Sequence, residues 1–460
     1  MHKIKILFVL VLLILPIIMT GCKKEEQITL RPVTLEYWGV DEDEEALQAI
    51  ITEYREKRPH VQINYRKFNK DEYEEELLEA LAQEEGPDII SVPNVKLRNY
   101  LTKITYLPET MQVQELSDQG VPVNVTKQAI SFNKARNDYL DFIYDTIVKE
   151  GQRQEGVRGP VPDQIVGIPL HIDTMVLYYN KDMLDAAQIT DAPRTWFQFQ
   201  DAVKALTRVD DNNNIVQSGA ALGTSNNVNY MTDILAALIL QSGGLMTNET
   251  MTRVYFNEVP PGGDFGFPPA YTAFQFYMDF ASTVKDSYTW NKKMPNSLEA
   301  FIQGRVAFYL GFYEDYENIK DKNPKLNFKV SSLPQIQGNL NANVARFNLI
   351  SVSNKSMNTA QAWDFIQYLT SIENLSLYLE EAKKPTPLRA LINSQTQDEL
   401  LKPFAEQLLT VKLWYEGYDY DKVEDIFAQL IDDLTEQRYQ NDIEAVENAA
   451  RQVQGTMYKN

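Results

Sequence analysis

Residues 33–92 alternate between short strand patterns and longer helical patterns, and this alternation constrains the fold more than any other feature of the chain. The strand pattern occurs at residues 34–38, 61–65 and 89–92. Apolar residues at helical spacing occupy residues 46–54 and 73–81 between them. The order β-α-β-α-β predicts a parallel sheet with right-handed crossovers. Ligands of such sheets bind beyond the carboxyl ends of the strands, so the loops that begin at Gly39 and Pro93 are the first candidates for a site.

A second α/β unit begins near residues 167–169, which fits the length of the chain because 460 residues exceed one ordinary core. Thr195 and Gln198 have the spacing of a helix capping box. Further elements are predicted as helices at 234–239, 274–281, 297–303 and 363–369, strands at 176–179 and 306–310, and a long acidic helical region at 421–453.

The first residues have the pattern of a bacterial signal peptide, predicted for residues 1–21. A basic start precedes an apolar run at 6–19, which is shorter than the roughly 20 residues of a spanning helix. Cys22, the one cysteine, follows Thr20-Gly21 as in a lipobox, so no intramolecular disulfide can form. A lipidated Cys22 would anchor the protein to a membrane, with residues 22–32 as a tether. An uncleaved anchor helix remains the alternative.

Charge and motifs exclude several functions. The formal net charge is -20 without a basic tract, which argues against nucleic acid as a partner. No G-x-S-x-G, H-E-x-x-H or phosphate loop is present, and we expect neither catalytic residues nor a cofactor. Asp210, Asn212 and Asn214 imitate the start of a calcium loop, but the required glycine is replaced by Ile215, so a plain turn is favoured over a metal site.

Five stretches, in this order, resemble the bacterial extracellular solute-binding proteins of family 1, the group that includes the maltose-binding protein. The resemblance extends from about residue 33 to about residue 391, while residues 106–164 depart from it. The matching stretches are Leu35-Glu36-Tyr37-Trp38; residues 54–61 with Arg58-Pro59; Gly86-Pro87-Asp88-Ile89; Gly167-Ile168-Pro169 with residues 177–181 and 193–196; and Phe301, Gly304, Ala307 and Gly311.

The resemblance implies an α/β, two-lobe periplasmic-binding-protein fold of type II with a ligand cleft between lobes that close by hinge bending. It places the first lobe at 33–170 and 310–345 and the second at 175–305 and 350–460. The chain would cross between them near 170–174, 306–310 and 345–350.

The function implied is that of a monomeric substrate-binding lipoprotein on the outer face of the cell membrane, which delivers a sugar or oligosaccharide to the permease subunits of an ABC importer. Peptides, polyols and anions stay open as solutes because the fold hosts many ligands. A lipid-anchored glycoside hydrolase and a non-transporting surface sensor stay open as alternative functions.

Candidate ligand contacts in the first lobe follow the strand ends. Trp38 could stack on a sugar ring or pack in the core. Asp41 and Asp43 could bind hydroxyl groups or complement the N-terminus of the next helix. Asn94 offers an amide donor and acceptor.

The remaining candidates lie at crossings and in the second lobe, where a structural role is the alternative for each. His171 and Asp173 flank the first crossing, and Arg346 precedes the third. The aromatic candidates are Tyr288 and Trp290, in a polar break between helices, and Phe312 and Tyr313, which follow Gly311.

Overall fold

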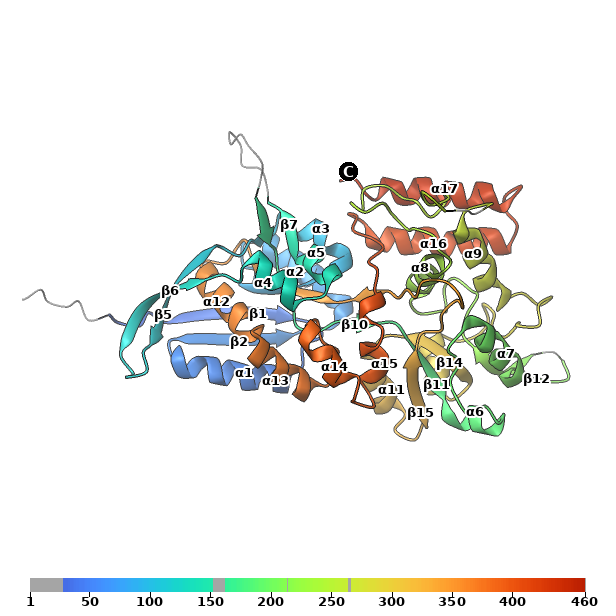
Figure 1. The fold of residues 1–460 in the computed structure, drawn as a ribbon, viewed down its shortest axis with the longest axis horizontal. Coiled ribbons are helices and arrows are strands. Elements are labelled where there is room, and N and C mark those ends of the chain that lie inside the picture. The colour runs from blue at the N-terminus through green and yellow to red at the C-terminus, as the bar shows by residue number, and fades with distance from the viewer. Residues whose placement is uncertain (1–27, 152–161, 213, 264–265, 460) are drawn as a thin grey trace, which may run out of the picture.

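The structure is a computed structural model that describes residues 28–151, 162–212, 214–263 and 266–459. Two sheets, each with its own hydrophobic core, form two lobes that follow one another along the long axis (Figure 1). The predicted two-lobe α/β fold is therefore confirmed. The predicted signal peptide and Cys22 lie outside the described residues. Among the described residues, no helix combines the length and hydropathy that crossing a bilayer requires.

The first-lobe sheet contains the predicted parallel β-α-β-α-β unit. Strand β1 pairs in parallel with β2 on one side and with β3 on the other, and β17 joins β3 in the antiparallel direction. The carboxyl ends of β1 and β3 therefore meet at one edge of the sheet. In order across the sheet, the strands are β2 (Val61–Lys67), β1 (Val33–Gly39), β3 (Ile89–Pro93), β17 (Asn348–Ser353) and β4 (Ile104–Thr105), with β9 (Ile168–Pro169) also paired to β17.

Helices of the first lobe bury the apolar faces that the sequence predicts. The helix after β1 buries Leu47, Ile50 and Tyr54, and it packs against two helices from much later in the chain. Arg58 at its C-terminus forms an ion pair of 2.5 Å with Asp364, which fixes these distant segments together. The helices are α1 (Glu44–Lys57), α2 (Lys70–Ala82), α3 (Leu97–Tyr100), α12 (Thr359–Leu369) and α13 (Ile372–Ala382).

The second-lobe sheet is mixed. Its central strand β14 runs parallel to β13 and antiparallel to β11, and β15 is an edge strand. Across the sheet the order is β12 (Arg208–Val209), β13 (Ile215–Ala220), β14 (Val306–Gly311), β11 (Val176–Asn180) and β15 (Phe328–Ser332).

The second-lobe helices begin where the capping signals predict. Thr195 and Gln198 form both hydrogen bonds of the capping box at the start of α7. The predicted acidic helical region consists of two helices, α16 and α17, which lie side by side and pack together (Figure 1). The helices are α6 (Lys181–Ala186), α7 (Trp196–Leu206), α8 (Met231–Gln241), α9 (Pro269–Asp279), α10 (Ser297–Ile302), α11 (Glu314–Lys322), α16 (Tyr420–Thr435) and α17 (Asp442–Gly455).

The segment that departs from the family pattern adds structure to the first lobe. It contains a hairpin at the end of the molecule far from the second lobe (Figure 1). Its elements are β5 (Thr110–Leu116), β6 (Pro122–Gln128), α4 (Phe132–Asp138), α5 (Asp141–Ile147), β7 (Val148–Glu150) and β8 (Asp163–Ile165).

The lobe boundaries predicted after residue 305 are wrong. Residues 310–345 belong to the second lobe because β14 and β15 pair with β11. Of residues 350–460, β17, α12 and α13 belong to the first lobe, and only the later part, with α16 and α17, joins the second core. The error arose because an isolated strand pattern does not indicate which sheet the strand joins.

Two of the three predicted crossings are present, since β10 (Asp173–Thr174) and β16 (Ala345–Arg346) pair with each other between the sheets. The predicted crossing at 306–310 is instead β14, inside the second-lobe sheet. A further passage occupies residues 388–414, where buried residues alternate between the two cores. It includes α14 (Ile392–Gln395) and α15 (Lys402–Ala405).

Candidate functional site

A cavity of about 260 Å³ lies between the lobes, beyond the carboxyl ends of β1 and β3. Seven of the residues predicted as ligand contacts line it: Asp41, Asn94, His171, Asp173, Phe312, Tyr313 and Arg346. They come from the strand-end loops of the first lobe, from both paired crossings and from the start of α11. The position of the cavity thus agrees with the strand-end rule.

Four predicted contacts do not line this cavity. Trp290 is fully buried in the second core, where its indole Nε1 donates to Asn227 Oδ1 at 3.2 Å. Trp38 packs against Phe68, with ring centroids 4.7 Å apart. Asp43 instead caps α1 and accepts from Ala46 N at 2.8 Å, and Tyr288 Oη accepts from Asn291 Nδ2 at 3.1 Å. Each of these residues uses its polar group or ring in a contact within its own lobe, as the structural alternative expects.

The first-lobe corner of the cavity is a charged cluster around Asp41. Lys384 Nζ donates to the backbone carbonyl of Asp41 and lies 3.3 Å from His171 Nε2. Burial, followed by the charge of Lys384, lowers the pKa of His171 to about 3. His171 is therefore neutral at neutral pH, so its contact of 3.4 Å with Asp41 is not an ion pair, and Nε2 accepts from Lys384.

Asp41 itself remains ionised. Burial opposes its charge, but the ammonium groups of Lys384 and Lys70 act against burial, and the pKa of the Asp41 carboxyl lies below its ordinary value. A bond from Asn348 acts in the same direction. The cavity therefore presents a carboxylate whose geometry is fixed from several sides.

Asp173 connects the first crossing to the second lobe. Its Oδ1 accepts from Tyr313 N at 2.6 Å, and its Oδ2 accepts from Glu314 N at 3.1 Å, at the start of α11. Both carboxylate oxygens thus accept backbone N–H groups, and the residue positions the hinge against α11. These bonds favour the charged form, but burial outweighs them and raises the pKa of Asp173 to about 7.

Arg346 lies in the second-lobe wall and is held by a dense set of partners. Its Nε donates to Asp233 Oδ2 at 2.7 Å, and its Nη2 donates to Tyr420 Oη at 2.9 Å. Glu424 lies 3.3 Å from the same Nη2. The guanidinium also lies 5.5 Å from the ring centroid of Phe312. Its charge is therefore neutralised before any solute arrives.

Two ion pairs join the lobes across the cavity. Lys70, at the start of α2, pairs with Glu314 of α11. Lys96 lies between Glu74 at 2.6 Å and Asp421 of α16 at 2.7 Å. The described arrangement therefore has the two lobes linked at two points beside the cavity.

Sequence reasoning missed several lining residues, chiefly Lys70, Lys384, Tyr420 and Glu424. Lys70 follows the carboxyl end of β2, so the strand-end rule could have found it. The other three lie near or beyond residue 391, where no family motif guides the alignment, and nothing local in the sequence marks them.

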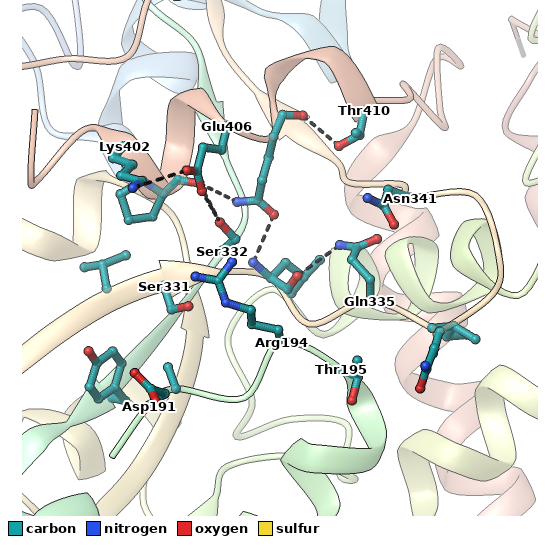
Figure 2. A pocket seen from close by; sticks show the side chains of 18 of the residues that line it. Asp191, Arg194, Thr195, Ser331, Ser332, Gln335, Asn341, Lys402, Glu406 and Thr410 are labelled. Atoms are coloured by element: carbon teal, nitrogen blue, oxygen red, sulfur yellow. Dashed lines mark hydrogen bonds and ion pairs between the residues drawn. The ribbon is translucent and has the colours of Figure 1, made fainter. Parts of the chain in front are cut away.

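A second cavity, of about 620 Å³, lies beside the edge strand β15, on the second lobe. Figure 2 shows side chains from three segments facing this space, including Arg194, Ser332 and Glu406. Glu406 lies 3.4 Å from Ser332 Oγ and 3.6 Å from Lys402 Nζ. Its lining residues come from the second lobe and from the passage at residues 388–414, whereas both lobes line the first cavity.

The candidate calcium loop is a hydrogen-bonded turn. Asp210 Oδ1 accepts from the backbone N–H of Asn212 at 2.9 Å and of Asn214 at 2.8 Å. Its other oxygen accepts from Asn214 Nδ2 at 3.0 Å. Both oxygens that a cation would need are used by the turn. Within the described ranges, no group of three or more acidic, histidine or cysteine side chains is arranged to hold a metal.

Comparisons with known proteins agree with this geometry. The sequence profile of the family described as bacterial extracellular solute-binding protein matches residues 39–375. A cyclo/maltodextrin-binding protein complexed with maltotetraose has a TM-score of 0.68 at 16% identity, over 93% of this chain and 99% of that chain. The cyclic alpha-maltosyl-1,6-maltose binding protein from Arthrobacter globiformis gives the same values.

A third similar structure is an ABC transporter solute-binding protein from Thermotoga lettingae, bound with alpha-D-tagatose. Its TM-score is 0.65 at 18% identity, and the match covers 92% of this chain and 100% of that chain. At these identities the three structures establish a shared fold over nearly the whole chain.

Proposed function

The chain belongs to the bacterial extracellular solute-binding proteins, and from this premise we propose that it captures a sugar or small oligosaccharide between its lobes and delivers it to an ABC permease. The observation that carries the proposal is the cavity that both lobes and both paired crossings line. The three similar structures include proteins described with maltotetraose and with alpha-D-tagatose, which supports a carbohydrate as the solute.

The chemistry of the cavity suits a polyhydroxylated ligand. Hydroxyl groups both donate and accept, and the walls offer carboxylate acceptors at Asp41 and Glu424, ammonium donors at Lys70 and Lys384, and the Asn94 amide. Phe312, Tyr313, Phe347 and Tyr420 supply apolar faces between these polar groups.

Delivery would depend on closure at the crossings. The paired strands β10 and β16 lie between the sheets, so rotation there would move each lobe as a body. A solute that contacts both lobes favours the closed form by its extra contacts in that form, and a permease could read the closed shape.

We favour a receptor over a glycoside hydrolase. Hydrolysis needs a free carboxylic acid beside the scissile bond. Asp173 is the cavity carboxyl with a pKa near 7, but both of its oxygens accept backbone N–H groups. Incubation with oligosaccharides followed by a reducing-end assay should therefore detect no release of sugar, and release that Asp173→Asn abolishes would overturn this choice.

Membrane attachment is proposed through Cys22. Its place after Thr20-Gly21 supports lipidation, and Cys22→Ser should move the protein from the membrane fraction to the medium or periplasm. A variant that stays membrane-bound would indicate an anchor helix at residues 6–19 instead.

Calorimetric titration of residues 23–460 with a panel of sugars tests the capture proposal. At least one sugar should bind, and Asn94→Ala should weaken binding by about 2- to 10-fold, the worth of one hydrogen bond. Arg194→Ala, in the second cavity, is the matched control and should leave binding unchanged. Absence of binding by every sugar, or loss of binding only in the Arg194 variant, would refute the proposal.

A further inference from the structure

The interlobe cavity has the size of one sugar ring. Its volume is about 260 Å³. A protein cavity of about 150 Å³ holds benzene, with its six heavy atoms, so this cavity has room for about ten. A pentose or hexose has about ten to twelve heavy atoms, whereas a disaccharide has about twenty-three. A second ring would therefore have to extend outside the cavity.

The cross-lobe ion pairs restrict such an extension. Lys70 with Glu314, and Lys96 with Asp421, all line the cavity and join the lobes there. These pairs are present in the described arrangement, and the cavity volume is that of the same arrangement. A longer saccharide would have to separate at least one pair or hold the lobes apart.

The charges of the lining disfavour an anionic solute. Each ammonium and guanidinium already contacts an acceptor: Lys70 contacts Glu314, Lys96 contacts Glu74 and Asp421, Lys384 contacts the Asp41 carbonyl, and Arg346 contacts Asp233 and Glu424. A phosphate or carboxylate entering the cavity would approach these carboxylates, and among the described lining residues Lys384, which contacts a neutral carbonyl, is the cation left to offset that repulsion.

The carboxylates are likewise engaged, which disfavours a cationic solute. Asp173 uses both oxygens on backbone N–H groups. Glu314 Oε1 accepts from Tyr230 Oη at 2.7 Å, and its Oε2 pairs with Lys70. An ammonium group would have to displace one of these partners to gain a charge contact.

From cavity size and charge pairing together, we infer that the solute is an uncharged sugar of a single ring, or a polyol of similar size. This inference rests on the proposed function and narrows it, because the fold also accommodates long oligosaccharides. Neutral hydroxyls could then donate to the further lone pairs of the Asp41 and Glu424 carboxylates and accept from the Asn94 Nδ2 group, because Asn94 Oδ1 already accepts from Phe347 N.

The test is calorimetric titration of residues 23–460 with three classes of compound. The neutral small compounds are hexoses, pentoses and sorbitol, and the larger sugars are maltose and maltotetraose. The charged compounds are glucuronate, glucose 6-phosphate and glucosamine. A neutral single-ring sugar or the polyol should bind at least tenfold more tightly than every larger or charged compound. A disaccharide, tetrasaccharide or charged sugar that binds as tightly would overturn the inference and leave the capture proposal standing. If no compound bound, both would fail.

A substitution tests the restriction by the cross-lobe ion pairs. Lys96→Ala removes the ion pair with Asp421, so the ratio of the affinity for a monosaccharide to the affinity for maltose should fall by at least threefold. Lys204→Ala, which removes an exposed ion pair with Asp286 far from the cavity lining, should leave the preference unchanged. An unchanged preference in the Lys96 variant would contradict the restriction by these pairs.

Discussion

Trp290 illustrates why residue type alone did not identify every ligand contact. A tryptophan in a polar break between helices suits a stacking platform, yet this one is fully buried, and its N–H bonds Asn227. The partner lies more than sixty residues away in sequence, so no local pattern could reveal it. Asp41 and Asn94 were predictable because their strands end beside them, and the strand-end rule depends only on local order.

Replacing Trp290 by Ala should destabilise the fold without acting on the solute directly. Removal of a large buried ring leaves a cavity, and the free energy of unfolding should fall by about 3–5 kcal/mol. Phe197→Ala is the matched control because that ring is 72% exposed, and its effect should stay within about 0.5 kcal/mol. Urea denaturation measures both. A Trp290 variant with unchanged stability but lost binding would restore the stacking role.

His171 should make stability depend on pH. Burial lowers its folded pKa from 6.5 to about 3, so between these values the unfolded chain binds a proton that the folded chain does not. This contribution to stability is present above pH 6.5 and is lost as the pH falls toward 3. Asp173, whose folded pKa rises to about 7, binds a proton more readily in the folded state and so stabilises the fold as the pH falls below 7. The pH dependence of wild-type stability therefore does not isolate the contribution of His171.

The His171→Gln variant isolates the effect. From about pH 7 to about pH 5, wild type should lose more stability in urea denaturation than this variant, because only wild type carries the titrating imidazole. Equal losses in the two proteins would show that His171 titrates normally in the folded state.

At the scale of elements, the sequence predicted strands and helices well and their partners less well. The parallel unit β2-β1-β3 and the capped α7 follow from period and capping residues within a few positions. The strand β14 was predicted as a crossing, and β17 was divided between a crossing and the second lobe, because both are short apolar strands that either sheet could accept. Only pairing with β11 or β3, set by the three-dimensional packing, decides between them.

The ion pair between Lys96 of η1 (Asn94–Lys96) and Asp421 of α16 should contribute to closure of the lobes. Lys96→Met should weaken binding of the solute by about 1.4- to fivefold, since a partly exposed pair is worth about 0.2–1 kcal/mol. Added salt should weaken binding to wild type more than to the variant, because salt screens the pair. Titration calorimetry at low and high ionic strength measures both, and equal salt dependence would exclude a role for this pair.

At the scale of the whole molecule, capture of a solute requires two lobes that move about the paired crossings. The ion pairs across the cavity join the two lobes in the described arrangement. A solute that favours this state must contact both lobes, as Asn94 on one side and Arg346 with Tyr420 on the other would allow.

The most direct test measures the distance between the lobes with and without solute. Spin labels at Glu75→Cys on α2 and Glu317→Cys on α11, two exposed positions beside the cavity, would be the only cysteines in residues 23–460. Pulsed electron paramagnetic resonance should show a broad or longer distance distribution without sugar and a shorter, narrower one with it. A sugar that binds by calorimetry yet leaves this distribution unchanged would contradict capture by closure between the lobes.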